Sequence, residues 1–225
     1  PEDFQVLLKP GTPVDIELYT LISNIANESH DSSFISFYDF FVEREDSFLY
    51  SKCILQSHCT EMGKFTAILC IARAIQNKWH TLDNEMKLEI RSTLWNVIFG
   101  LKFSNYLVNK AQETMVLLLY YELPDNWPNF VIDVVEQDAK VENEQDGLLM
   151  DERCLGLICT FLEKMTNDFN DSNMGGKVFS MGKYLSDNYF MQITDLCSKI
   201  TQKGKVELAK MALKIFALID RKSVV

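Results

Sequence analysis

The sequence predicts an all-α protein built from antiparallel helical hairpins, and three observations support this fold class. Apolar residues recur at the i, i+3/i+4, i+7 spacing of amphipathic helices along almost the whole chain. The 225 residues include only 9 Gly and 5 Pro, which is too few for the many turns of a β-sandwich or barrel. Apolar residues make up 47% and charged residues 24%, as is typical of a globular chain rather than a disordered one.

The first two helical pairs are predicted from four apolar stripes. A stripe over residues 14–25 is followed by a Phe-rich stripe over residues 34–41. A shorter helix over residues 48–55 then precedes a long one over residues 65–79, which ends at a Lys-Trp step. Each stripe covers one face of a helix, so each predicted helix has one face to bury.

The third pair is predicted from its capping residues as well as from its apolar spacing. Thr81 is expected to cap the first helix of this pair, because its hydroxyl can accept hydrogen bonds from first-turn amides. Acidic residues follow it, at the positive end of the helix dipole. Asn105 is expected to cap the second helix, which stops at Leu123-Pro124.

The second half of the chain contains two more predicted pairs. Pro128 suits the first turn of a helix, where its missing N–H would be unpaired anyway. Residues 136–147 are the most polar stretch and are predicted to be a loop, and residues 170–176 are predicted to be a second loop. Gly204 is expected to end the ninth helix, so that the last helix begins just after it.

Taken in pairs, these helices give an α-solenoid of about five hairpins with a period near 40–45 residues, in the range of HEAT or armadillo repeats. A single pair cannot bury its apolar faces alone, so neighbouring pairs stack into one continuous core. A globular helical bundle has the same periodicity and stays open as an alternative. The predicted hairpins span residues 13–45, 47–79, 81–122, 127–168 and 175–221.

The sequence contains no pattern typical of an enzyme. It has neither a P-loop nor a dinucleotide-binding glycine motif. Cys53, His58 and Cys59 lie close together, but no second pair with zinc-ligand spacing accompanies them. No catalytic residue, metal or cofactor is therefore expected. Most of the six Cys lie inside apolar helical patterns and are expected to be reduced core residues.

The chain is also expected to have no membrane partner. Residues 1–11 are polar and lack the apolar region of a signal peptide. No apolar run approaches the roughly 20 residues that a membrane span needs.

The net charge of −10 is divided unevenly along the chain. Residues 175–225 hold nine Lys or Arg and four acids, a net of +5, so residues 1–174 carry −15. The acidic part could attract a basic protein partner, and the basic end could contact phosphates. The alternative is that both parts are solvated helix faces.

Three segments resemble the importin-β (karyopherin) superfamily of nuclear transport receptors. Residues 65–82 resemble the second helix of the second repeat, and the helix after it, in exportins. Residues 108–135 include Trp127-Pro128 and resemble the third repeat running into the W-P-x-F opening of the fourth. Residues 206–224 resemble a helix of the tRNA-exporting branch, exportin-t. The other explanation of these matches is packing and capping signals shared by many helical repeats.

The resemblance implies that residues 1–225 are the N-terminal HEAT-repeat segment of a larger solenoid. It implies a monomeric nuclear export receptor that binds the small GTPase Ran in its GTP form and helps to carry tRNA out of the nucleus. Such a receptor contacts nucleoporins and shuttles between nucleus and cytoplasm. The alternative function is a generic HEAT-repeat scaffold for protein–protein interaction, which would show no preference for the nucleotide state of a GTPase.

The resemblance also indicates where the contacts would lie. Ran is held by the second helices of the N-terminal repeats, which are expected here near residues 32–45, 62–79 and 105–122. The polar residues expected to contact Ran are Gln76, Lys78, Asn109, Lys110 and Glu113. The basic residues expected to contact RNA are Lys199, Lys203, Lys205 and Lys210. The acidic bias of the N-terminal region is expected to suit a GTPase with basic patches.

Overall fold

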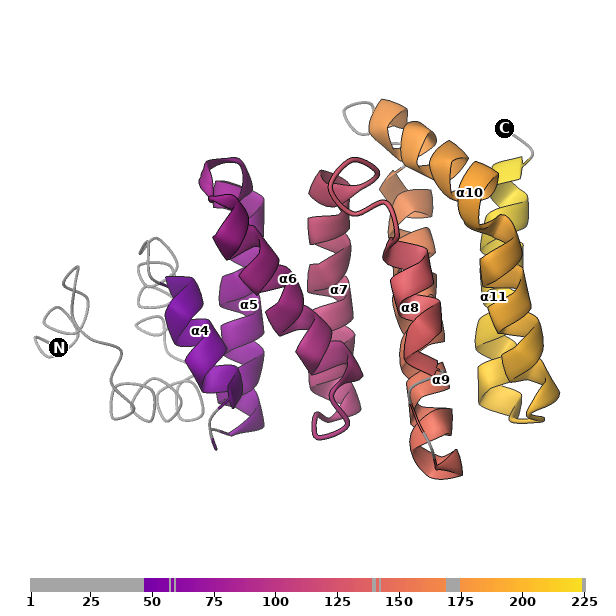
Figure 1. The fold of residues 1–225 in the computed structure, drawn as a ribbon, viewed down its shortest axis with the longest axis horizontal. Coiled ribbons are helices and arrows are strands. Elements are labelled where there is room, and N and C mark those ends of the chain that lie inside the picture. Colours follow the sequence, from indigo (N-terminus) through magenta and orange to yellow (C-terminus); the bar gives the residue numbers. More distant parts are fainter. Residues whose placement is uncertain are drawn as a thin grey trace, which may run out of the picture. The chain divides into compact units, whose positions relative to one another are not determined.

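The computed structural model confirms the predicted all-α fold. Its described residues form eight α-helices and one 3-10 helix, with no β-strand among them (Figure 1). The described residues are 47–56, 58, 60–138, 141, 143–168 and 175–223. The predicted hairpin over residues 13–45, and with it the helix expected near residues 32–45, lies outside the described residues.

The chain divides into two compact units. Among the described residues, unit 1 comprises residues 47–97 and 103–117, and unit 2 comprises residues 98–102 and those from 118 onward. Each unit has its own internal contacts. None of the described helices is both long enough and apolar enough to span a bilayer.

Unit 1 contains α4 (Ser47–Gln56), α5 (Glu61–Lys78) and most of both α6 (Asn84–Phe99) and α7 (Asn105–Glu122). Helices α4 and α5 pack against each other, and an ion pair between Lys52 and Glu89 joins α4 to α6. On α5, Ile68, Ile71 and Ile75 recur at helical spacing and are fully buried. Burying each of these side chains contributes roughly 2 kcal/mol.

Two of the helix starts in unit 1 are fixed by side-chain caps. The amide of Gly63 donates to Thr60 Oγ1 at 3.2 Å, so Thr60 caps α5. The amide of Met86 donates to Asp83 Oδ1 at 2.7 Å, so Asp83 caps α6. The prediction that Thr81 is this cap is wrong. Trp79–Thr81 forms a 3-10 helix, in which the Thr81 hydroxyl donates back to the Lys78 carbonyl at 2.8 Å.

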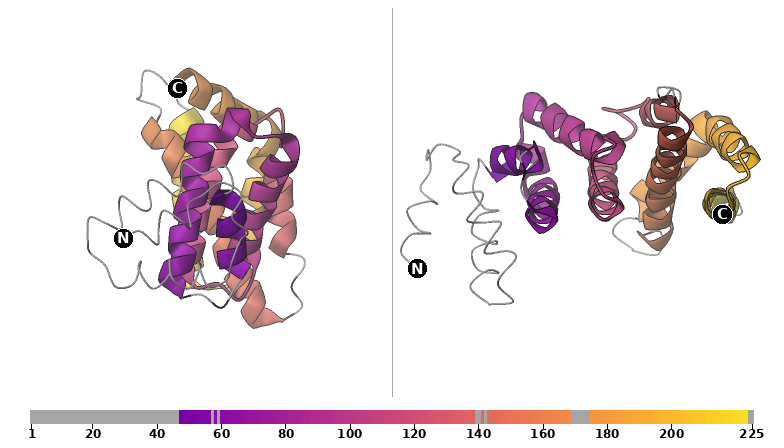
Figure 2. Two further views of the ribbon diagram at one scale, coloured as in Figure 1. Left: turned by 90° about the vertical axis from the view of Figure 1, so that its left-hand side faces the viewer. Right: turned by 90° about the horizontal axis from the view of Figure 1, so that it is seen from below.

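Unit 2 contains four complete helices, which are α8 (Phe130–Asp138), α9 (Glu144–Asp168), α10 (Gly175–Gln202) and α11 (Val206–Ser223). Helix α8 packs against α9 and α10, and α11 packs against α9 and α10 (Figure 2). Gly204 lies in the turn between α10 and α11 with φ 71. Only glycine adopts that backbone conformation at little cost, so Gly204 ends α10 as predicted.

Most of the described residues in the polar stretch 136–147, which is predicted to be a loop, are helical. Helix α8 continues to Asp138, and α9 already begins at Glu144. The amide of Asp146 donates to the side chain of Asn143 at 2.8 Å, which supplies the cap that starts α9. Acidic residues near this end of α9 also suit the positive end of the helix dipole.

The burial of the cysteines follows the prediction with one exception. Cys70, Cys154, Cys159 and Cys197 are buried free thiols, as predicted, and Cys59 lies outside the described residues. Cys53 is exposed, so its assignment to the core is wrong. Cys53 lies one turn after the exposed Leu49, on the same face of α4. Its exposure follows from the face of the helix on which it lies and not from its hydrophobicity.

Candidate interaction surface

Helices α5 and α7 each leave one stripe of side chains accessible. On α7 the stripe follows i, i+3, i+4, i+7 and i+11 spacing and contains Tyr106, Asn109, Lys110, Glu113 and Leu117. On α5 the accessible stripe contains Met62, Phe65, Leu69, Arg73 and Gln76. Both stripes belong to unit 1, and each lies opposite the buried face of its own helix.

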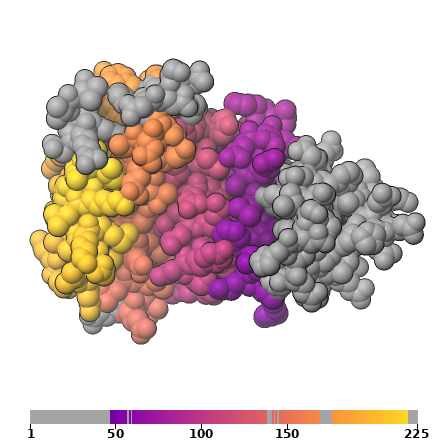
Figure 3. Space-filling view, turned by 180° about the vertical axis from the view of Figure 1, so that it is seen from behind, coloured from indigo at the N-terminus to yellow at the C-terminus, as the bar shows by residue number. Residues whose placement is uncertain are grey.

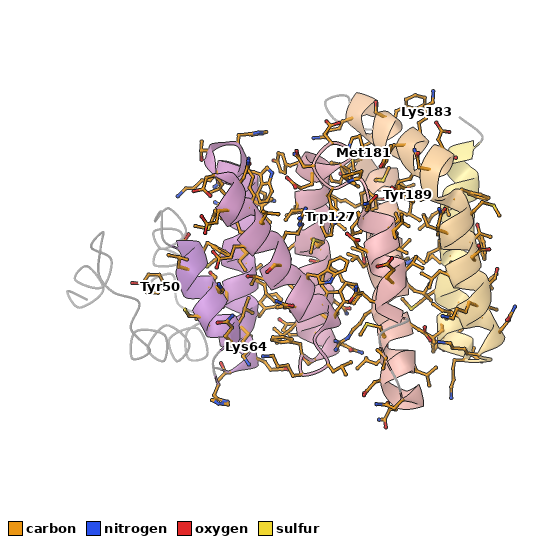
Figure 4. All side chains as sticks on the ribbon, in the orientation of Figure 1. Tyr50, Lys64, Trp127, Met181, Lys183 and Tyr189 are labelled. Carbon is orange, nitrogen blue, oxygen red and sulfur yellow. The ribbon has the colours of Figure 1, made fainter. Side chains whose placement is uncertain are left out.

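Two aromatic contacts bring the N-terminal ends of α5 and α7 together. The rings of Phe65 and Tyr106 stack with their centroids 4.7 Å apart and their planes at 17°. Next to them, Lys64 Nζ lies 5.8 Å from the centroid of the Phe103 ring. Figure 4 labels Lys64, which marks this end of α5. The two accessible stripes therefore meet at the stacked rings.

The five residues expected to contact Ran fall into two separate groups. Asn109, Lys110 and Glu113 lie in the first half of α7, close after Tyr106, and Lys110 Nζ is 2.8 Å from Glu113 Oε2. Gln76 and Lys78 lie at the C-terminal end of α5. Since α5 rises about 1.5 Å per residue, Gln76 is roughly 16 Å along the helix from the stacked rings. The structure thus brings three of the five residues together.

Sequence reasoning missed the apolar part of this surface. Met62 is 42% exposed and Tyr106 is 49% exposed, yet neither was predicted to contact a partner. A signal was present for Tyr106, because position 106 does not belong to the apolar stripe that includes Leu107 and Ala111. A large aromatic residue on the polar side of an amphipathic helix is a candidate contact residue.

The acidity expected around α5 and α7 is not found there. Residues 47–97 and 103–117 carry seven Lys or Arg and five Asp or Glu, so this part of unit 1 is slightly basic. The acids are concentrated instead in residues 1–46, which hold ten Asp or Glu and two Lys or Arg, and in residues 118–174, which hold thirteen Asp or Glu and three Lys or Arg. Helix α5 alone carries a net charge of +2 and α7 alone a net charge of −1, so the expected attraction of a basic patch to the acidic N-terminal region stays a prediction that α5 does not support.

The lysines expected to contact RNA belong to unit 2 and differ in their partners. Lys203 Nζ lies 2.7 Å from Oδ2 of Asp151, which is fully buried, and Lys210 Nζ lies 2.7 Å from Glu207 Oε1. Lys199 and Lys205 are exposed. Part of the positive charge of the C-terminal segment is thus compensated by carboxylates.

Helix α11 contributes a further ion pair on the surface of unit 2. Lys214 Nζ lies 2.5 Å from Glu163 Oε1 on α9, and this hydrogen bond raises the pKa of Lys214. Figure 3 shows α11, in yellow, on the outside of unit 2. Within the described ranges, no group of three or more His, Cys, Asp or Glu side chains is arranged to hold a metal ion.

The Trp127-Pro128 step ties the start of α8 to α10. The indole N–H of Trp127 donates to Asp133 Oδ2 at 2.6 Å, and its ring meets Phe130 edge-on at 5.1 Å. The carbonyl of Pro128 accepts hydrogen bonds from the hydroxyls of Tyr184 at 3.0 Å and Tyr189 at 2.5 Å. Trp127 and Tyr189 are labelled in Figure 4. This step therefore has a structural role within unit 2.

Comparisons with known proteins match both halves of the chain. The family described as "Exportin 1-like protein" matches residues 104–218, about half of the chain. The family described as "Importin-beta N-terminal domain" matches residues 41–99. Exportin-1 of Schizosaccharomyces pombe (strain 972 / ATCC 24843) is 24% identical over 181 residues, which is 77% of this chain and 16% of that protein. The chain thus spans only a small part of that relative's length.

Proposed function

Because this chain belongs to the Exportin 1-like protein family, we propose that it is the N-terminal repeat segment of a nuclear export receptor that binds Ran in its GTP form. The observation that carries the proposal is the order of the two family matches. An importin-β N-terminal domain over residues 41–99 is followed by an exportin 1-like region over residues 104–218. The family is one of transport receptors rather than enzymes.

The accessible stripes of α5 and α7 support a protein contact on unit 1. They combine exposed apolar side chains with polar ones, as in the centre and rim of protein–protein interfaces. GTP dependence would come from the GTPase, because γ-phosphate contacts order its switch segments and so create the surface that the receptor grips. Cargo that binds the receptor–GTPase complex would bind more tightly when the GTPase is bound, and the GTPase would bind more tightly by the same factor when cargo is bound.

We extend the proposal to tRNA as cargo, on the resemblance of residues 206–224 to the tRNA-exporting branch. Lys205 is the best candidate for a phosphate contact in this segment, since its side chain is exposed while Lys203 and Lys210 are paired with carboxylates. Each phosphate contact on single-stranded or duplex nucleic acid makes affinity fall with salt. Replacing Lys205 with Ala should therefore weaken tRNA binding and lower its salt dependence, whereas Lys210→Ala should change it less, because Lys210 is paired with Glu207.

Movement between nucleus and cytoplasm, contact with nucleoporins and action as a monomer follow from the same proposal. The alternative is a generic HEAT-repeat scaffold, in which the same helical faces bind other proteins. The two functions differ in one measurable property, which is the dependence of GTPase binding on the bound nucleotide.

The test is a titration of the chain with Ran loaded with a non-hydrolysable GTP analogue and, separately, with GDP. We expect at least about tenfold tighter binding of the GTP form, equivalent to about 1.4 kcal/mol. Equal affinity for the two forms, or no binding to either, would reject the proposal in favour of the scaffold.

A further inference from the structure

We draw no further inference here: the strongest candidate, the exposed apolar side chains of Phe179, Phe190 and Met191 on α10 in unit 2, carries none, because nothing in the structure shows what covers them and the exposed Lys183 and Asp187 of the same helix leave no net charge between them that would select a partner.

Discussion

The ammonium nitrogen of Lys203 lies 2.7 Å from a carboxylate oxygen of Asp151, whose side chain is fully buried in α9. Lys203 belongs to the turn that precedes α11, so this pair joins that turn to α9. Further along, Lys214 on α11 pairs with Glu163 on α9. From the first pair to the second, the chain advances 12 residues on α9, from Asp151 to Glu163, and 11 residues from Lys203 to Lys214. Helices α9 and α11 therefore run in the same direction.

The first prediction follows from the buried member of this pair. Lys203→Met should lower the free energy of unfolding by about 3 kcal/mol, because removing the cation leaves a buried carboxylate with its desolvation cost less well compensated. Urea unfolding followed by circular dichroism measures the change. The control is Lys210→Met, which breaks the exposed pair with Glu207 and should cost less than about 0.5 kcal/mol. Similar losses in the two variants would contradict the assigned role of burial.

The second prediction concerns the start of α6. Asp83→Ala should destabilise the protein by about 1 kcal/mol, because the Met86 amide loses its capping acceptor. Thr81→Ala is the matched control and should cost about 0.5 kcal/mol or less, since its hydroxyl bonds only to a local carbonyl in an exposed turn. Urea unfolding of both variants decides between them. A larger loss for Thr81→Ala would restore Thr81 as the capping residue.

The helices themselves could be predicted from the sequence because their periodicity is a local property. The helix expected near residues 105–122 is Asn105–Glu122 in the structure, and the one expected near 62–79 is Glu61–Lys78. Helix ends marked by caps were harder to predict. A hydroxyl such as that of Thr81 can either accept from the following turn or donate to the preceding one, and the sequence does not distinguish these alternatives.

The candidate site was predicted only in part, because its assembly depends on contacts between helices. The sequence shows which residues lie on the accessible face of one helix, but it does not show which of them lie beside which residues of the neighbouring helix. The stack of Phe65 on Tyr106 fixes the relative axial position of α5 and α7. It places Asn109 near the N-terminal end of α5 and leaves Gln76 at the other end.

The third prediction is that stability falls at alkaline pH. Burial raises the pKa of the Cys70 thiol to about 12 from an ordinary value of 9.0, while a hydrogen bond with Ser51 acts in the opposite direction. Above pH 9 the thiol of the unfolded chain loses its proton while the folded one keeps it. The contribution of the Cys70 thiol to the free energy of unfolding is therefore complete below pH 9. It is lost as the pH rises toward 12, by up to about 1.4 kcal/mol per pH unit.

Urea unfolding at pH 8 and at pH 10.5 measures this loss. Cys70→Ala should show a shallower decline in the free energy of unfolding between the two pH values, even though its stability at pH 8 is lower. Cys53→Ala is the control, because Cys53 is exposed, and it should keep the slope of the unsubstituted chain. Equal slopes in all three proteins would show that the Cys70 thiol does not titrate differently in the folded state.

The fourth prediction uses the separation of the two groups of polar residues on unit 1. Gln76 and Asn109 are roughly 12 Å apart along the helix direction, because Gln76 lies 11 residues beyond the stacked rings on α5 and Asn109 only three residues beyond them on α7, so their contributions to binding of GTP-form Ran should be independent. We expect Gln76→Ala and Asn109→Ala each to weaken binding about threefold, and the double variant about ninefold, because distant sites add in free energy. The contrasting pair is Lys110→Ala with Glu113→Ala, whose charged groups are 2.8 Å apart, and here the double variant should lose less than the two single losses together. Coupling between Gln76 and Asn109 as strong as that between Lys110 and Glu113 would mean that the GTPase bridges both ends as one contact, and the division of this surface into two groups would then be wrong.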